Sequence, residues 1–413
     1  MDSLSDEQWV SHFGRFEPLA DNLGQPLALR YHGHQFRHYN PNIGDGRGFL
    51  FAQCRDRQGR YLDLGTKGSG QTPYSRRGDG RLTLLGGIRE VLATSYLEYL
   101  GVNTSKSLSL IETGEALTRG DEPSPTRSSV LVRLSHSHIR FGTFQRLAFL
   151  EQADNLEALV SYCRQYYYPD CATAQDLFEE VLRASADTVA SWMAAGFVHG
   201  VMNTDNMNIT GESFDYGPYR FLPTLQSGHT AAYFDQQGLY AFGRQPEAMY
   251  WNLAQLAQSL SLITDDKPLI KAMENFADQY RERLCHHVFR RLGMKRRKLE
   301  TDTEFVLATF KYLEDSQTPW PQFWHDWQGG AGQKPRALRG PNGRFYSGEH
   351  FEDWFRLLEK FEASCGGETE ADHPPSLLYD EIGALWEPID RDDDWSDFHD
   401  KVKSFQGISA FML

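Results

Sequence analysis

A polar segment near the middle of the chain carries the side chains best suited to binding a metal ion. Asn203, Asp205 and Asn206 lie in one short stretch that begins at His199, and Asp215 follows it. Carboxylate and amide oxygens are the ligands that magnesium and manganese prefer, so Asn206 and Asp215 are the predicted metal ligands. Asn and Asp also commonly do no more than satisfy the backbone of a loop, and that alternative stays open.

The spacing of this segment is typical of a phosphate-transfer site. A protein-kinase catalytic loop has the order His-x-Asp-x-x-x-x-Asn, and an Asp-x-Gly follows it. His199, Asn206 and Asp215 keep these positions. Val201 stands where a kinase has its catalytic base, and its side chain cannot accept a proton. Asp205 is the only carboxylate of the loop that could replace it, so Asp205 is the predicted general base.

A lysine and a glutamate form a second pair with possible chemistry. Lys67 follows a predicted strand, and Glu90 lies in the helix predicted after it. In kinases a strand lysine grips phosphate and a glutamate of the next helix holds that lysine. Glu90 is next to the apolar stripe of its helix, where a buried carboxylate needs a cationic partner. Arg89 is the competing partner for Glu90. By residue type alone, Lys67 and Glu90 would both be solvated at the surface.

Two copies of Gly-Asp-Gly-Arg flank Lys67, at Gly44-Asp45-Gly46-Arg47 and at Gly78-Asp79-Gly80-Arg81. Glycine lets backbone N–H groups approach a phosphate closely. A single copy is more typical of an ordinary turn, but two copies beside a lysine favour a cradle for an anion.

Two further arginines, Arg133 and Arg140, flank the segment Ser-His-Ser-His at 135–138. Arginine matches phosphate oxygens in a bidentate way, although spacing alone favours surface arginines here. The serines and histidines fit neither a nucleophile elbow nor a zinc-protease motif.

The elements around these residues change character along the chain. Residues 49–54 and 61–64 are predicted strands joined by a turn at 56–59, and 129–134 is a third predicted strand. Residues 84–100 have helical spacing, with Gly101 as the residue after the helix. Thr173 and Asp176 predict a capping box for a helix that runs through Trp192 and Met193 to Gly196.

This order predicts an α+β fold with two lobes. We expect a strand-rich, nucleotide-binding lobe at 1–145, a helical lobe with the catalytic and metal loop at 146–330, and a helical C-terminal extension at 331–413 to which the sequence assigns no chemistry. A cleft between the lobes would hold the polar residues.

Composition limits the class of protein. The chain has 413 residues, 40% hydrophobic and 13% aromatic, which is typical of packed globular domains. The formal net charge is −14 (42 basic and 56 acidic residues) with no basic stripe, so a nucleic-acid partner is not expected. The sequence shows no signal peptide or membrane span, and its five cysteines are widely spaced. These features predict a cytoplasmic protein without a membrane partner.

Taken in order, the motifs resemble the selenoprotein O family of protein adenylyltransferases, also called the YdiU family. The resemblance covers about residues 24–260. The matching segments are 31–47 (YHGHQFRHYNPNIGDGR), 67–81 (KGSGQTPYSRRGDGR), 88–90 (IRE), 135–144 (SHSHIRFGTF), 199–208 (HGVMNTDNMN), 215–218 (DYGP) and 243–253 (GRQPEAMYWNL).

The resemblance implies a protein-kinase-like fold that binds ATP, the co-substrate, in a flipped orientation. AMP would then pass to Ser, Thr or Tyr hydroxyls of other proteins. Asp205 would be the general base, Glu90 would hold Lys67 on phosphate, and Asn206 with Asp215 would bind magnesium, or manganese. Residues implied to line the nucleotide or its phosphate tail are Gly44, Gly46, Arg47, Lys67, Asp79, Gly80, Arg133, Arg140 and Asp215.

Departures from the family concern the helix start and the C-terminal part. Gly86 and Gly87 precede Ile88 in place of polar residues and would weaken the helix start, and a family cysteine pair near the end is absent. Two other functions stay open, a conventional phosphotransferase and an inactive ATP-binding pseudokinase that acts as a scaffold.

Overall fold

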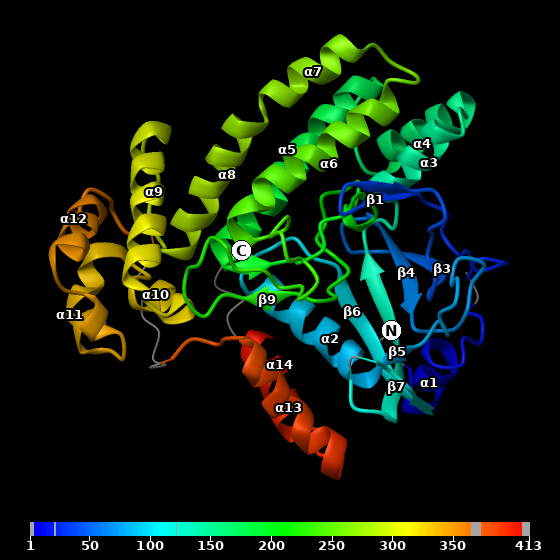
Figure 1. Cartoon of the computed structure of the whole chain (residues 1–413), viewed down its shortest axis with the longest axis horizontal. Helices are drawn as coiled ribbons and strands as arrows, with labels where there is room; N and C mark the ends of the chain where they lie inside the picture. The colour runs from blue at the N-terminus through cyan, green and yellow to red at the C-terminus, as the bar shows by residue number, and fades with distance from the viewer. Residues whose placement is uncertain (1–3, 20–21, 121, 365–372, 407–413) are drawn as a thin grey trace.

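A computed structural model describes residues 4–19, 22–120, 122–364 and 373–406. The chain is α+β, as the sequence predicts: the strands gather in the first third and helices form most of the remainder (Figure 1). The strands are β1 (Gly33–Gln35), β2 (His38–Asn40), β3 (Leu50–Arg55), β4 (Tyr61–Lys67), β5 (Leu82–Thr83), β6 (Lys106–Leu117), β7 (Thr126–Ser135), β8 (Phe197–Val198) and β9 (Arg220–Phe221).

Helices α1 and α2 lie among the strands of the first part, and the other helices follow β7. They are α1 (Asp6–Phe13), α2 (Leu84–Tyr99), α3 (Phe141–Phe149), α4 (Ala153–Tyr166), α5 (Ala174–Ala195), α6 (Gln245–Leu260), α7 (Asp266–Glu274), α8 (Phe276–Arg291), α9 (Leu299–Ser316), α10 (Trp320–Asp326), α11 (Lys334–Arg339), α12 (Glu349–Leu358), α13 (Tyr379–Asp392) and α14 (Ser396–Gln406). Short 3-10 turns are η1 (Thr204–Asn206), η2 (Phe242–Arg244), η3 (Gly330–Gln333) and η4 (Gly343–Phe345).

An antiparallel sheet forms the first part of the molecule. Its order is β3-β4-β7-β5, and β6 pairs with β7. The predicted strands at 49–54, 61–64 and 129–134 are confirmed as β3, β4 and β7. Sequence patterning does not indicate β6, because much of this strand is exposed and its register shifts between Glu112 and Ala116. Apolar residues of β3, β4 and β7 pack on α1 in a small core of their own.

The helix that carries Glu90 is confirmed as α2. Thr83 caps its start, where its hydroxyl accepts a hydrogen bond from the N–H of Gly86 at 3.0 Å. The helix begins at Leu84 despite the two glycines that follow. A Cβ on Gly87 would lie 2.4 Å from Leu110 Cδ1, so the glycine permits the close approach of α2 to β6. Tight packing on the sheet therefore offsets the low helix propensity of this segment.

The helical part is built around α5, which packs on α6 and α8. Its predicted capping box at Thr173 and Asp176 is confirmed, and Gly196 ends it in the left-handed conformation with a φ of 69°. One large core joins α2 to α5 and α6, and a second core lies among α8, α9, α10 and α12. The sheet and the helices therefore share buried surface around the segment that contains the catalytic loop.

The C-terminal segment divides between two places. Helices α11 and α12 lie beside α9 and α10, whereas α13 and α14 return to α2 (Figure 1). Phe405 of α14 contacts the Tyr96 ring at 4.9 Å, and Asp393 pairs with Arg127 of β7 at 2.7 Å. Cys365 lies outside the described residues.

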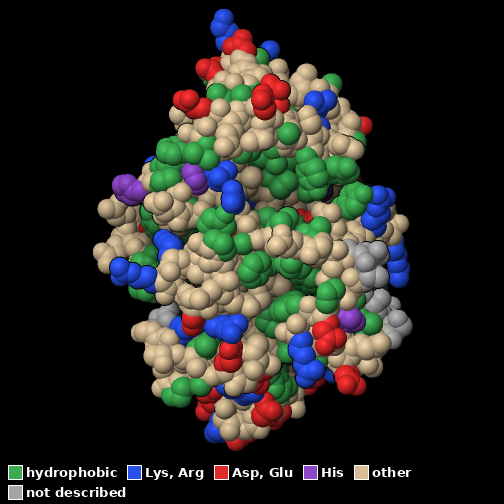
Figure 2. Space-filling model, turned by 90° about the vertical axis from the view of Figure 1, so that its right-hand side faces the viewer, with side chains coloured by type: hydrophobic (Ala, Val, Ile, Leu, Met, Phe, Trp, Pro, Cys, Tyr) green, Lys and Arg blue, Asp and Glu red, His purple; other side chains and the backbone are tan. Residues whose placement is uncertain are grey.

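The surface combines apolar and charged regions. Figure 2, a view from the right-hand side of Figure 1, shows apolar side chains across the middle of this face and charges of both signs towards its two ends. Within the described ranges, no helix has the length and apolar character needed to cross a membrane.

Candidate functional site

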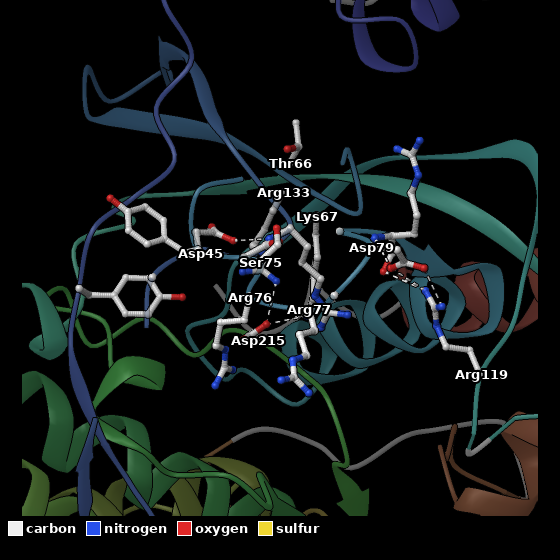
Figure 3. A pocket seen from close by; sticks show the side chains of 18 of the residues that line it. Asp45, Thr66, Lys67, Ser75, Arg76, Arg77, Asp79, Arg119, Arg133 and Asp215 are labelled. Atoms are coloured by element: carbon white, nitrogen blue, oxygen red, sulfur yellow. Dashed lines mark hydrogen bonds and ion pairs between the residues drawn. The ribbon is translucent and has the colours of Figure 1, made fainter. Parts of the chain in front are cut away.

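A polar cavity of about 620 Å³ brings together residues that are far apart in the sequence (Figure 3). Its lining includes both Gly-Asp-Gly-Arg copies, the end of β4, and residues of β7 and of the segment after the catalytic loop. The predicted site residues that line it are Gly44, Gly46, Arg47, Lys67, Asp79, Gly80, Arg133, Arg140 and Asp215.

Buried charges at the inner end of the cavity form one network. Lys67 donates hydrogen bonds to Glu90 and, at 2.6 Å, to Asp215 Oδ1. Arg133 lies 3.2 Å from Asp215 Oδ1 and 3.6 Å from Glu90 Oε2. Burial alone would raise the pKa of Asp215, but Lys67, Arg133 and Arg140 outweigh it and hold that pKa well below its usual value. Asp215 is therefore an ionised carboxylate at neutral pH.

The structure thus pairs Glu90 with Lys67 rather than with Arg89. Glu90 is 1% exposed, whereas Arg89 donates hydrogen bonds to the backbone oxygens of Gly217 and Tyr219. Arg89 consequently fixes the segment that follows Asp215. Asp215 itself has a φ of 67°, a rare conformation for a residue other than glycine and one that often marks functional sites.

The predicted catalytic loop is held by hydrogen bonds of the residues that precede Asp205. His199 is buried and its Nε2 lies 3.1 Å from the Phe214 oxygen, so the histidine joins the loop to the segment before Asp215. Asn203 Oδ1 accepts hydrogen bonds from the Phe36 N–H and the Tyr240 hydroxyl. His199 and Asn203 therefore have structural roles. For Asn203 this agrees with the alternative that polar residues of the loop satisfy backbone groups.

Asp205 differs from these neighbours. Asp205 is 8% exposed and is not among the residues that line the cavity. Its Oδ1 is buried without a hydrogen-bond partner in the part of the chain that the structure describes. Arg140 donates to its backbone oxygen at 3.0 Å. Burial raises the pKa of the Asp205 carboxyl to about 6, although Arg140 lowers it. A carboxylate with a free oxygen and a pKa near neutrality suits a general base.

Both glycines of the first Gly-Asp-Gly-Arg copy contact the loop 71–81. A Cβ on Gly44 would lie 2.5 Å from the Tyr74 ring, and a Cβ on Gly46 would lie 3.1 Å from the Tyr74 oxygen. The Thr72 hydroxyl donates to the Asp45 oxygen at 2.6 Å. These glycines are therefore required for packing in addition to any approach of backbone N–H groups to phosphate.

The second copy lies at the outer end of the cavity. Gly80 has a φ of 72°, and a Cβ there would lie 2.1 Å from the Gly70 oxygen, so only glycine fits. The Asp79 carboxylate accepts two hydrogen bonds from Arg119, at 2.8 and 3.2 Å. Burial opposes the ionisation of Asp79, but Arg119 lowers its pKa below the usual value.

The surface alternative for the two later arginines is wrong. Arg133 is 5% exposed and Arg140 is 4% exposed. The Nε–H of each is buried without a hydrogen-bond partner among the described residues. In folded proteins, buried guanidinium groups rarely keep N–H donors without a hydrogen-bond partner. At the inner end of a polar cavity they provide a site for an anion.

The predicted metal ligands fit magnesium by their donor chemistry. Asp215 provides a carboxylate, and Asn206, whose Nδ2 donates to the Val201 oxygen at 2.9 Å, has an amide oxygen. Within the described ranges no group of three or more His, Cys, Asp and Glu side chains is arranged to hold a metal. Magnesium commonly takes one or two carboxylates and completes its coordination with phosphates and water.

Several cavity residues were not among the predicted site residues, although Asp45 and Arg81 belong to the two Gly-Asp-Gly-Arg copies. They come from the two loops around the glycines and from the turn after β6: Tyr31, Asp45, Tyr74, Ser75, Arg76, Arg77, Arg81, Thr118 and Arg119. The available signal was the three arginines within residues 76–81, a stretch that lies inside a motif that also contains Lys67.

The buried carboxyl group of Glu212 gives a prediction about how stability depends on pH. Glu212 accepts a hydrogen bond from the His136 N–H at 2.9 Å, and burial raises its pKa from 4.5 to about 7. A raised pKa in the folded state means that stability falls as pH rises between these two values. We expect the stability of Glu212→Gln relative to the wild type to be greater at pH 8 than at pH 5, by up to about 3 kcal/mol. Melting temperatures at both pH values test this.

The exposed carboxylate of Glu157 provides the control, because Glu157→Gln removes the same charge without desolvation. An equal effect of Glu212→Gln at pH 5 and pH 8 would show that Glu212 is not protonated preferentially in the folded state.

Comparisons with known proteins point in one direction. A family model described as protein adenylyltransferase SelO matches residues 1–406. Three similar proteins are each named protein nucleotidyltransferase YdiU. The one from Trichormus variabilis is 42% identical over 430 residues, which covers 98% of this chain and 87% of the relative. The Gloeobacter violaceus protein is 44% identical over 421 residues, with 97% and 85% covered. The Synechocystis protein is 43% identical over 434 residues, with 98% and 88% covered.

Proposed function

The chain belongs to the protein adenylyltransferase SelO family, and from that premise we propose that it transfers AMP from ATP to Ser, Thr or Tyr hydroxyls of other proteins. The observation that carries the proposal is the position of Asp205. Val201 occupies the kinase base position, while Asp205 is buried with one carboxyl oxygen that has no hydrogen-bond partner among the described residues.

We also propose a kinase-like two-lobed arrangement and a flipped ATP. The support for the fold is the relation of Lys67 on β4 to Glu90 on α2 and to Asp215 after the loop. The support for the orientation is electrostatic. An adenine at the inner end would offer Arg133 and Arg140 only neutral acceptors, whereas a triphosphate tail would satisfy their spare donors and also offset their charge. The α-phosphate then lies towards the mouth and Asp205.

The transfer step is a displacement at the α-phosphorus. The acceptor hydroxyl oxygen forms a bond to phosphorus while its proton passes to the Asp205 carboxylate. The bond from the α-phosphorus to the oxygen bridging to the β-phosphate breaks, and pyrophosphate leaves with that electron pair. Arg133, Arg140 and Lys67 offset the charge on the leaving group. Asn206 and Asp215 would hold magnesium, which when bound neutralises further phosphate charge.

The partners that we propose are ATP and hydroxyl-bearing proteins. Nucleic acid is not included, given the net charge of −14. The cytoplasm is the proposed location, since Cys54, Cys163, Cys171 and Cys285 are all free thiols.

The test is self-labelling with magnesium and ATP that carries its label on the α- or the γ-phosphate. We expect label to be retained from the α-phosphate only, because the α-phosphorus faces the base. Retention from the γ-phosphate only would make the protein a conventional phosphotransferase. Label from neither position, together with ATP affinity that does not depend on magnesium, would favour the scaffold.

A further inference from the structure

The loop 71–81 is fixed over the glycine segment at the cavity. The Arg30 Nε–H donates to the Tyr74 hydroxyl at 2.7 Å, and the Thr72 hydroxyl donates to the Asp45 oxygen. The Ser75 hydroxyl donates to the Gly46 oxygen, and within the loop the Gln71 side-chain amide donates to the Gly78 oxygen at 2.8 Å. The loop is exposed, yet three of its hydroxyl side chains anchor it to neighbouring segments.

Arg76 occupies a strained position in this loop. Its φ is 54°, in the left-handed region that residues with a Cβ rarely adopt. Such a conformation persists only where the surroundings enforce it, and it is common at ligand-binding segments. Hydrogen bonds flank Arg76 on both sides: the Ser75 hydroxyl donates to the Gly46 oxygen, and the Gln71 amide donates to the Gly78 oxygen. Arg76 is one of the residues that line the cavity, and its side chain extends beside that of Arg77 (Figure 3).

The cations of the cavity differ in whether they already have an anionic partner. Arg81 pairs with Glu115 at 2.7 Å and Arg119 with Asp79 at 2.8 Å. Arg133 and Lys67 pair with Asp215 at the inner end. Within the described part of the chain, the guanidinium groups of Arg47, Arg76 and Arg77 make no hydrogen bond or ion pair, so all three are free to bind an incoming anion. Of these three, only Arg76 has a backbone in the left-handed region.

Arg76 lies nearer the solvent than the inner cations of the cavity. Arg76 is exposed, whereas Lys67, Arg133 and Arg140 are at most 6% exposed. In the proposed function the triphosphate tail occupies the inner end, so the α-phosphate lies on the side of the cavity where Arg76 is.

We propose that Arg76 binds the α-phosphate of the nucleotide at the point of transfer, a role that rests on the proposed function. The inner cations Lys67, Arg133 and Arg140 serve the leaving pyrophosphate. Charge on the non-bridging oxygens of the α-phosphate needs a donor nearer the mouth, and a guanidinium supplies two N–H groups in a fixed geometry. The competing ligand would be an acidic side chain of the acceptor protein.

The test uses the full chain and labelled ATP. We expect Arg76→Ala to lower the self-labelling rate at saturating ATP by roughly 10²-fold, while the Kd for ATP changes little because the inner cations hold the tail. Arg76→Lys should recover part of the rate, since a lysine keeps the charge but not the bidentate fork. Arg57→Ala is the matched control: Arg57 is exposed in the β3–β4 turn, away from the cavity.

A stereochemical measurement separates the two ligands. Self-labelling is compared for the two diastereomers of ATP with sulfur on the α-phosphate. A contact between Arg76 and one α-phosphate oxygen predicts that Arg76→Ala changes the ratio of the two rates. An unchanged ratio with a lower rate would assign Arg76 to the acceptor and overturn the proposal, as would an unchanged rate.

Failure of the proposed function is a separate result. If the wild-type chain retains no label from the α-phosphate, adenylyl transfer itself is wrong. If the wild type labels normally and Arg76→Ala behaves like Arg57→Ala, only the assignment of Arg76 is wrong.

Discussion

Replacement of Asp205 by asparagine is expected to lower AMP transfer by roughly 10²- to 10⁴-fold, the range that a positioned general base contributes. The substitution keeps the size of the side chain and removes its ability to accept a proton at neutral pH. The backbone oxygen of residue 205 would still accept the hydrogen bond of Arg140. ATP affinity should therefore change little. Single-turnover labelling and equilibrium binding of a fluorescent ATP analogue measure the two quantities.

The control for this variant is Asp154→Asn, which removes an exposed carboxylate from the first turn of α4. Transfer at the wild-type rate in Asp205→Asn would exclude Asp205 as the base. A parallel loss of ATP affinity and transfer would instead indicate that Asp205 binds the nucleotide or its metal.

Substitution of Lys67 by methionine should destabilise the protein by about 3 to 5 kcal/mol, because it leaves a charge buried without its partner. Glu90 would lose the Lys67 contact, and its Oε2 already has no hydrogen-bond partner in the described structure. Arg133, at 3.6 Å, is a weak substitute. Urea unfolding measures the loss, and nucleotide binding should disappear together with it, since Lys67 is part of the phosphate site.

The double substitution Lys67→Met with Glu90→Leu separates stability from function. Replacing both members of a buried ion pair by apolar side chains is commonly neutral or stabilising. We therefore expect the double variant to regain most of the stability but no ATP binding or transfer. If the double variant were as unstable as Lys67→Met, the pair would not be the source of the instability. ATP binding in the double variant would remove Lys67 from the site.

Local patterns were enough to predict the elements that position the site. The alternation of residues in β3, β4 and β7 and the helical spacing of α2 depend on side chains close in sequence. The start of α5 at Thr173 and its end at Gly196 depend on hydrogen bonds within one turn. β6 escaped prediction because its exposed residues and shifted register remove the alternation.

Burial decided what local patterns left open. The spacing of Arg133 and Arg140 is equally compatible with positions on the surface. Only the structure shows that both are packed beside the Phe214 ring and buried with spare N–H donors. The choice between Lys67 and Arg89 as the partner of Glu90 likewise depended on the direction in which α2 presents its side chains. Residues adjacent in sequence point to different sides of a helix, so spacing alone could not select one.

The sequence by itself determined which chemical groups this protein has: a loop with Asp205 and Asn206, the carboxylate of Asp215, a strand lysine, and two glycine-rich segments. It also determined, through motif order, the family to which they belong. Only the tertiary structure decided which groups meet. Lys67 and Asp215 are 148 positions apart and lie at 2.6 Å, and Arg76 reaches the cavity because a distant glycine segment anchors its loop. Such contacts depend on how the sheet and the helices pack together, and the energy of that packing is spread over many residues that no short motif contains.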